Sequence, residues 1–176
     1  MPNLSQFRAS LVNGGVRSNT FEVNLNFPAF VQGGGEASRV GVFHCKAASL
    51  PGSTIADIPV YFQGRPTYVA GERQFDPWEV AIYNENFLIS NALENWMNGI
   101  NELSTNGGII QPSLYAVDMM VKQLDRNGTV LKKIKLINAW PVQLAPIQLD
   151  FEANNQIQIR PVVFRYDYFE SSAVNA

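Results

Sequence analysis

The chain has 176 residues, 46% of them hydrophobic and only 16% charged, which is long enough for one buried core and too apolar for a disordered chain. Its thirteen basic and fifteen acidic side chains give a net charge of −2. This balance argues against tight nucleic-acid binding, which needs an excess of basic side chains. One cysteine excludes an intramolecular disulfide, and no apolar run approaches the length of a membrane span.

The first 27 residues predict an arm followed by a strand. Residues 1–18 are polar and without periodicity, which predicts a flexible N-terminal arm. They lack the apolar core of a signal peptide, so we expect the chain to fold in a cytoplasm. Residues 19–27 alternate, with Phe21, Val23 and Leu25 on one face. This alternation predicts a half-buried strand whose polar face carries Glu22, Asn24 and Asn26.

Glycine and proline dominate the next part of the chain. Glycines 33–35 predict a flexible turn before a second extended apolar stretch over residues 40–46. Residues 47–71 contain six Pro and Gly residues between large apolar side chains, which predicts an extended hairpin loop. Exposed apolar side chains favour docking onto another surface. The candidates for this contact are Pro51, Gly52, Ile55, Ile58, Pro59, Tyr61 and Phe62.

The second half of the chain predicts one helix among strands. Residues 78–83 alternate as a strand, and apolar residues at helical spacing then run from Ile89 to Leu103, with a capping box at Asn91 and Glu94. Residues 114–124 and 129–140 predict strands joined by an Asn-Gly turn. A last strand over 156–169 changes phase, which predicts an extra residue near Arg160–Pro161.

These patterns together predict one domain over residues 1–176. Its class is mainly β: an antiparallel β-sandwich or barrel with one flanking α-helix.

Catalytic, cofactor and metal sites are not predicted. His44 and Cys45 are too few for a zinc site, and as neighbours in a strand they would point to opposite faces. Asp150 and Glu152, two residues apart, are typical of the wet face of a strand rather than of a glycosidase pair. Glycines 33–35 lack the Gly-Lys-Ser/Thr of a phosphate loop. We therefore expect a protein that is not an enzyme.

Three stretches carry distinctive motifs between residues 43 and 170. Residues 43–60 contain Cys-Lys-Ala and Leu-Pro, residues 64–87 contain Val-Ala-Gly-Glu-Arg and Phe-Asp-Pro-Trp, and residues 139–170 begin near Trp-Pro and contain Asn-Asn-Gln-Ile-Gln. In order and spacing, they resemble the tail tube protein of contractile-tailed bacteriophages of the T4 type.

The resemblance implies a homohexameric ring, stacked into a hollow tube inside a contractile sheath. It also implies partners: the sheath protein, a tape-measure protein in the lumen, and baseplate and tail terminator proteins. DNA would pass through without specific binding, and the tube would belong to the virion tail. With this family we expect residues 47–71 to contact the neighbouring ring, and we expect neither a cofactor nor membrane insertion.

A DNA conduit needs a neutral or acidic wall, because basic side chains would hold the phosphates. The alternating strands offer acidic or polar candidates for the lumen: Glu22, Asn24, Asn26 and Asp118, with Glu79, Asp150 and Glu152 as further positions.

Three alternatives remain at this point. The tube proteins of type VI secretion systems and of phage-derived injection devices are similar in fold. A monomeric β-sandwich binding module, for example for carbohydrate, would expose aromatic side chains, whereas Trp78, Trp96 and Trp140 follow core-like periods. An esterase-like enzyme would need a nucleophile elbow, which the sequence lacks.

Overall fold

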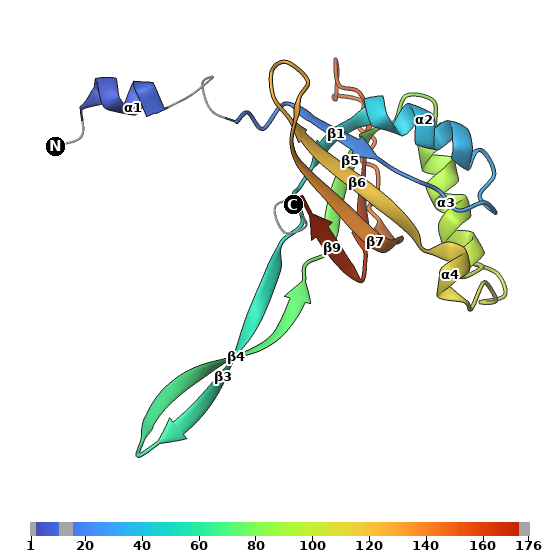
Figure 1. Ribbon diagram of the computed structural model, residues 1–176. Coiled ribbons are helices and arrows are strands. Elements are labelled where there is room, and N and C mark those ends of the chain that lie inside the picture. Colours follow the sequence, from blue (N-terminus) through green and yellow to red (C-terminus); the bar gives the residue numbers. More distant parts are fainter. Residues whose placement is uncertain (1–2, 11–15, 173–176) are drawn as a thin grey trace.

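The computed structural model describes residues 3–10 and 16–172, and Figure 1 shows a β-sheet body, helices along one side of it, and a long ribbon that projects away. In chain order the elements are α1 (Leu4–Ser10), β1 (Phe21–Asn24), α2 (Gly34–His44), β2 (Cys45–Ala48), β3 (Ser53–Phe62), β4 (Arg65–Phe75), β5 (Trp78–Tyr83), α3 (Leu88–Ile100), α4 (Pro112–Tyr115), β6 (Val117–Leu124), β7 (Val130–Leu144), β8 (Ile159–Arg165) and β9 (Tyr168–Ser171).

The body is an antiparallel seven-stranded sheet in the order β1-β6-β7-β8-β5-β2, in which β9 also pairs with β7. The long strand β7 joins its two halves. Residues 130–139 of β7 pair with β6, and residues 140–144 pair with β8. Strand β9 also pairs with β7, at residues 134–137, next to the part of β7 that pairs with β8. The predicted class, mainly antiparallel β, is confirmed.

One core lies between this sheet and α3. Trp78 and Trp96 are fully buried, and their rings lie 5.5 and 6.3 Å from the ring of Phe164. Each indole N–H donates to a backbone carbonyl at 2.8 Å, Trp78 to Ser49 and Trp96 to Tyr115. A buried indole N–H without a partner would be costly, so these bonds are part of the reason the core tolerates two tryptophans.

The prediction of a single helix is wrong. Helix α2 occupies residues 34–44, where the sequence predicts a glycine turn and an extended segment, and α2 packs against α3 and β1. Its buried positions are Gly34, Ala37 and Gly41. This face holds small residues because the neighbouring elements come close, so it lacks the apolar periodicity that identifies a helix. Helix α2 ends at His44, so strand β2 begins at Cys45.

Helix α3 is confirmed, but its predicted start is wrong. Ile89, Leu93 and Trp96 are buried as the spacing predicts. The residue before the helix is Phe87, in a left-handed conformation, and the Leu88 amide donates to Asn86 Oδ1 at 3.2 Å. Asn91 and Glu94 therefore lie inside the helix and form no capping box, and Leu103 lies beyond its end.

The strand predicted over residues 156–169 is two strands, β8 and β9, and the predicted extra residue near Arg160–Pro161 is absent. Residues 159–164 pair with β5 without interruption, so no extra residue lies near Arg160–Pro161. Regular strand pairing is interrupted at Tyr166 and Asp167, between β8 and β9. There the Asp167 backbone amide donates to the Ile137 carbonyl at 3.0 Å. A register shift also lies on the facing strand, between Pro141 and Gln143. Ile157, which suggested the change of phase, lies in the loop before β8 and is exposed, so it does not belong to the alternation of that strand.

The N-terminal segment contains α1, which stands apart from the body in Figure 1. Seven residues are fewer than two helical turns, too short for a periodic pattern, so the sequence does not predict it. Residues 1–2 and 11–15 of the predicted arm lie outside the described residues. In the part of the chain that the structure describes, no helix is long and apolar enough to cross a membrane.

Candidate assembly surfaces

The first candidate surface is the ribbon formed by β3 and β4 (Figure 1). The two strands pair from Ser53 with Phe75 at the base to Phe62 with Arg65 at the tip. At the base, the Phe75 ring packs on the rings of Tyr166 and Phe169, at 6.1 and 5.6 Å. The ribbon is therefore joined to the body by an aromatic cluster.

Large apolar side chains are exposed along the whole ribbon. Tyr61 and Phe62 are 72% and 71% exposed, and the remaining members of this set are about half exposed or more: Ile55, Ile58, Val60, Tyr68 and Val69. An isolated two-stranded hairpin is marginally stable in water, and exposed apolar patches mark interaction sites. Five of the residues that the sequence predicts for a contact lie on strand β3 of the ribbon: Ile55, Ile58, Pro59, Tyr61 and Phe62.

Two glycines shape the ribbon. A Cβ atom at Gly71 would lie 2.9 Å from the carbonyl oxygen of Ala56, beside the register shift between Ile55 and Asp57. A Cβ at Gly52 would lie 2.9 Å from Asp76 Oδ2. Gly71 permits the backbones of the two strands to approach closely, and Gly52 leaves room for the Asp76 carboxylate. Pro51 and Gly52 thus lie at the entrance to the ribbon rather than along its exposed part.

The second candidate surface is the outer face of β1, β6, the first part of β7, and β9. Because Val23 and Val121 are buried, their neighbours in sequence point outward. The pairing places Glu22 beside Lys122 and Lys133, and Asn24 beside Met120 and Lys135. We name this surface the polar face; its outward residues are Glu22, Asn24, Asp118, Met120, Lys122, Lys133, Lys135 and Glu170.

Ion pairs balance the charge of the polar face. Lys122 Nζ lies 2.7 Å from Glu22 Oε1, and Lys135 Nζ lies 2.7 Å from Asp118 Oδ2. The hydrogen bond from Lys135 lowers the pKa of Asp118, and Asp118 in turn raises the pKa of Lys135. Asn26 lies just past β1, and its side-chain nitrogen Nδ2 donates to the backbone carbonyl of Asp118 at 2.6 Å.

The structure thus brings together the four lumen candidates Glu22, Asn24, Asn26 and Asp118. The lysines beside them are not in the predicted set. Only the strand register identifies Lys122 as the partner of Glu22, one hundred residues away in the chain. The alternation of each strand could have shown that a lysine points outward, but not which carboxylate it meets.

The other acidic candidates lie elsewhere. Glu79 points outward from β5 in the other half of the sheet. Asp150 and Glu152 lie in the loop 145–158 and not on a strand, with Asp150 Oδ1 accepting a hydrogen bond from the Glu152 amide at 2.9 Å. The expectation of a shared strand face for these two acids is therefore wrong.

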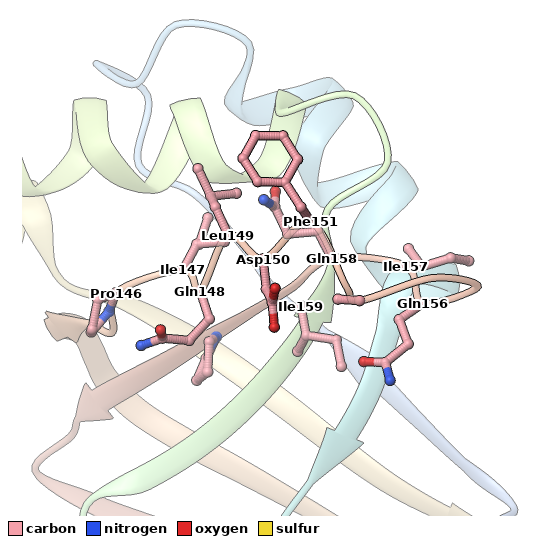
Figure 2. Close-up of a pocket in the computed structure, with 12 residues that line it drawn as sticks. Pro146, Ile147, Gln148, Leu149, Asp150, Phe151, Gln156, Ile157, Gln158 and Ile159 are labelled. Atoms are coloured by element: carbon pink, nitrogen blue, oxygen red, sulfur yellow. The ribbon is translucent and has the colours of Figure 1, made fainter.

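The loop 145–158 borders an open cavity of about 600 Å³, shown in Figure 2. In that view, Leu149 and Phe151 point to the side opposite Asp150. Leu149 is 85% exposed, and Phe151 has no shielding from solvent. Asp150 is the one ionisable side chain among the described residues that line the cavity. The lining offers no acid–base pair, so we regard this loop as an apolar surface rather than a reaction site.

His44 and Cys45 have structural roles, one in a side-chain contact and the other as a largely buried thiol. His44 Nε2 lies 2.6 Å from Glu85 Oε2, and burial raises the pKa of Cys45 to about 11. A thiol with so high a pKa is a poor nucleophile at neutral pH. Across residues 3–10 and 16–172, no group of three His, Cys, Asp or Glu side chains is arranged to hold a metal ion.

Comparison with known sequences identifies relatives over nearly the whole chain. The sequence profile of the family described as "Phage tail tube protein" matches residues 16–172. The tail tube protein gp19 of Enterobacteria phage T4 is 31% identical over 158 residues, which cover 88% of this chain and 90% of that protein. The tail tube protein of Serratia phage KSP90 is 28% identical over 156 residues, 87% of this chain and 88% of the relative.

Solved structures share the fold at lower identity. A chain from the cap that terminates the tube of the anti-feeding prophage superimposes with a TM-score of 0.64 at 18% identity, covering 92% of this chain and 93% of that one. A chain from the sheath–tube complex of the extracellular contractile injection system PVC gives a TM-score of 0.59 at 16% identity, covering 98% and 99%.

Proposed function

This chain belongs to the phage tail tube protein family, and we propose that copies of it close into rings of six that stack into a hollow tube. It is a structural subunit of a contractile tail. The family match covers the body, the ribbon and the loop 145–158.

The observation that carries the proposed stacking is the ribbon. Its large apolar side chains are half exposed or more although the ribbon is attached to a well-packed body. An apolar arm that reaches away from its own core is explained if a second copy covers it. Contact between the ribbon of one ring and the body of the next is heterologous, and a heterologous contact along an axis produces an open-ended filament.

Ring closure is supported by the strand order. Strands β1 and β2 end the sheet, and each is paired on one side. Such edges invite pairing with other chains unless they are covered. We propose that neighbouring copies cover these edges within the ring.

We further propose that the polar face lines the lumen. The face carries three lysines and three carboxylates, and two of the lysines are paired with Glu22 and Asp118, so it offers phosphates little net charge. A duplex would then pass without specific binding. A tape-measure protein would fill this space during assembly in the host cytoplasm, and a sheath, a baseplate and a terminator would contact the outside and the ends.

The second candidate is the tube of a phage-derived injection device. The fold shared with the anti-feeding prophage and PVC chains favours it, since those chains come from such assemblies. The subunit would work in the same way in both cases. Packaged DNA in particles that carry this tube would distinguish a virion from a device without DNA.

Electron microscopy and light scattering of the purified protein test the proposal. We expect rings with six-fold symmetry, and tubes at high concentration. A variant with a Gly-Ser turn in place of residues 57–70 keeps the aromatic base at Phe75, so it should fold and fail to form tubes. A protein that stays monomeric at high concentration would favour a binding module instead. Normal tubes from the shortened variant would remove the ribbon from the stacking contact.

A further inference from the structure

The two faces of the ribbon have different side chains. Opposite residues in an antiparallel pair share a face, so the pairing of Ile58 with Val69 and of Val60 with Thr67 defines one face, which also carries Phe62. We name it the aliphatic face. The pairing of Pro59 with Tyr68 and of Tyr61 with Pro66 defines the second. We name it the Tyr/Pro face.

Both faces need to be covered. On the aliphatic face Ile58, Val60 and Val69 are 51%, 50% and 53% exposed. On the Tyr/Pro face Tyr61 and Tyr68 are 72% and 63% exposed. A hairpin that lay flat on one surface would bury one face and leave the second in water. A ribbon used that way would be expected to carry polar side chains on its outer face, as an ordinary half-buried strand does.

The size of the ribbon supports the same conclusion. Residues 57–62 pair with residues 65–70, six on each strand. Two such strands are about 20 Å long and about 10 Å wide, so one face offers about 200 Å². A stable interface buries about 800 Å² on each partner. One face is thus too small for a lasting contact by itself, and both faces together offer about 400 Å² per ribbon, so a stable joint needs the ribbons of a ring to act together.

Resting on the proposed ring assembly, we propose that each ribbon inserts between two adjacent copies of this chain in the neighbouring ring. The aliphatic face packs on one copy and the Tyr/Pro face on the other. In a ring, the gap between adjacent copies is bounded by two different sides of the same chain, because the contact is heterologous. Two chemically different faces fit two different walls.

This arrangement couples stacking to ring closure. A ribbon that contacts two copies at once holds them together, so an incoming ring stabilises the closed form of the ring that it meets. The two contacts act as linked sites, and the second forms at a high effective concentration once the first is made. Loss of either face is then expected to weaken stacking, since each alone is a small contact.

Face-selective substitutions give the first test. The double variants Ile58→Thr/Val69→Thr and Tyr61→Thr/Tyr68→Thr each change one face and keep β-branched residues in the strands. We expect each to raise the critical concentration for tube formation about tenfold or more, with unchanged thermal unfolding of the monomer. If one double variant assembles like the wild type, its face is not in contact and the proposal is overturned.

Photo-crosslinking gives the second test and counts the partners. A tagged chain with a photoreactive residue at Val60, at Tyr61 or at both is mixed as a small minority into unlabelled chains, and tubes are irradiated. Each single label should give a two-chain product, and the double label a three-chain product. Only two-chain products from the double label would mean that one copy contacts both faces. Absence of rings and tubes in the unlabelled protein would instead contradict the proposed function itself.

Discussion

At the scale of single residues, His44 joins the end of α2 to the loop before α3. Its Nδ1 lies 3.0 Å from the Val40 carbonyl oxygen, and its Nε2 lies 2.6 Å from Glu85 Oε2. The hydrogen bond to Val40 raises the pKa of His44, burial opposes this, and Glu85 adds to the rise. The folded protein therefore keeps the imidazolium form up to a higher pH than the unfolded chain does.

This raised pKa predicts a pH-dependent contribution to stability. Because the folded pKa lies above the unfolded value of 6.5, the contribution is fully present below pH 6.5 and is lost as the pH rises through the folded pKa. The destabilisation caused by His44→Gln, measured by chemical unfolding, should be larger at about pH 5 than at about pH 9. An equal loss at both pH values would show that the ring acts by packing alone.

The ion pair of Glu22 and Lys122 makes a second prediction at this scale. Glu22→Lys places two lysines directly opposite each other, which costs about 0.2–1 kcal/mol of folding free energy. If the polar face lines the lumen, this variant should form tubes that retain DNA and deliver it slowly, most strongly at low salt. DNA delivery by assembled particles measures the effect.

A charge swap is the matched control for this variant. Glu22→Lys combined with Lys122→Glu restores the pair and the net charge of the polar face. Delivery should return to the rate of the unchanged protein. Normal delivery by the single variant would place Glu22 outside the lumen.

At the scale of elements, α2 shows why a helix with small residues on its buried face packs where one with larger residues there would not. A Cβ atom at Gly34 would lie 2.9 Å from the Phe27 Cβ and 3.4 Å from the Val31 Cβ, whereas one at Gly35 meets nothing within 4 Å. The two glycines are adjacent in sequence and differ only in their surroundings. Gly34 is thus required by packing, and Gly35 is not.

Alanine substitutions separate these roles. Gly34→Ala should destabilise the fold by about 1–3 kcal/mol, because Phe27 and α2 must move apart. Gly35→Ala should be neutral or stabilise the fold by up to about 1 kcal/mol, because alanine favours helix. Thermal unfolding of both variants is the measurement. Equal effects at the two positions would contradict the packing of α2 on Phe27.

At the scale of the whole molecule, low charge and an apolar ribbon predict assembly that depends little on salt. The net charge is −2, and stacking is proposed to bury Ile, Val, Phe and Tyr side chains. Raising NaCl from about 0.1 M to about 1 M shortens the Debye length from about 10 Å to about 3 Å. The critical concentration for tubes, measured by sedimentation, should change by less than about threefold, and sulfate should lower it. A steep increase with salt would instead indicate stacking by ion pairs.

Much of this molecule follows from local patterns in the sequence. Alternation identifies β1 and β5, helical spacing identifies α3, and Asn127–Gly128 identifies the turn between β6 and β7, where Gly128 has a φ of 79°. The breaker-rich apolar segment predicts an extended arm, and β3 and β4 form a ribbon there. Such features are readable because each depends on residues within a few positions of one another.

Only the tertiary structure decides the features that depend on long-range neighbours. Helix α2 has no apolar period because closely approaching residues, Phe27 among them, determine the size of its buried side chains. Lys122 and Lys135 neutralise the polar face through register, which no pattern within one strand contains. The two faces of the ribbon likewise follow from its register and its bulge. A one-residue slip in pairing would reverse every face, so packing across the sheet, and not the local sequence, decides which side chains meet.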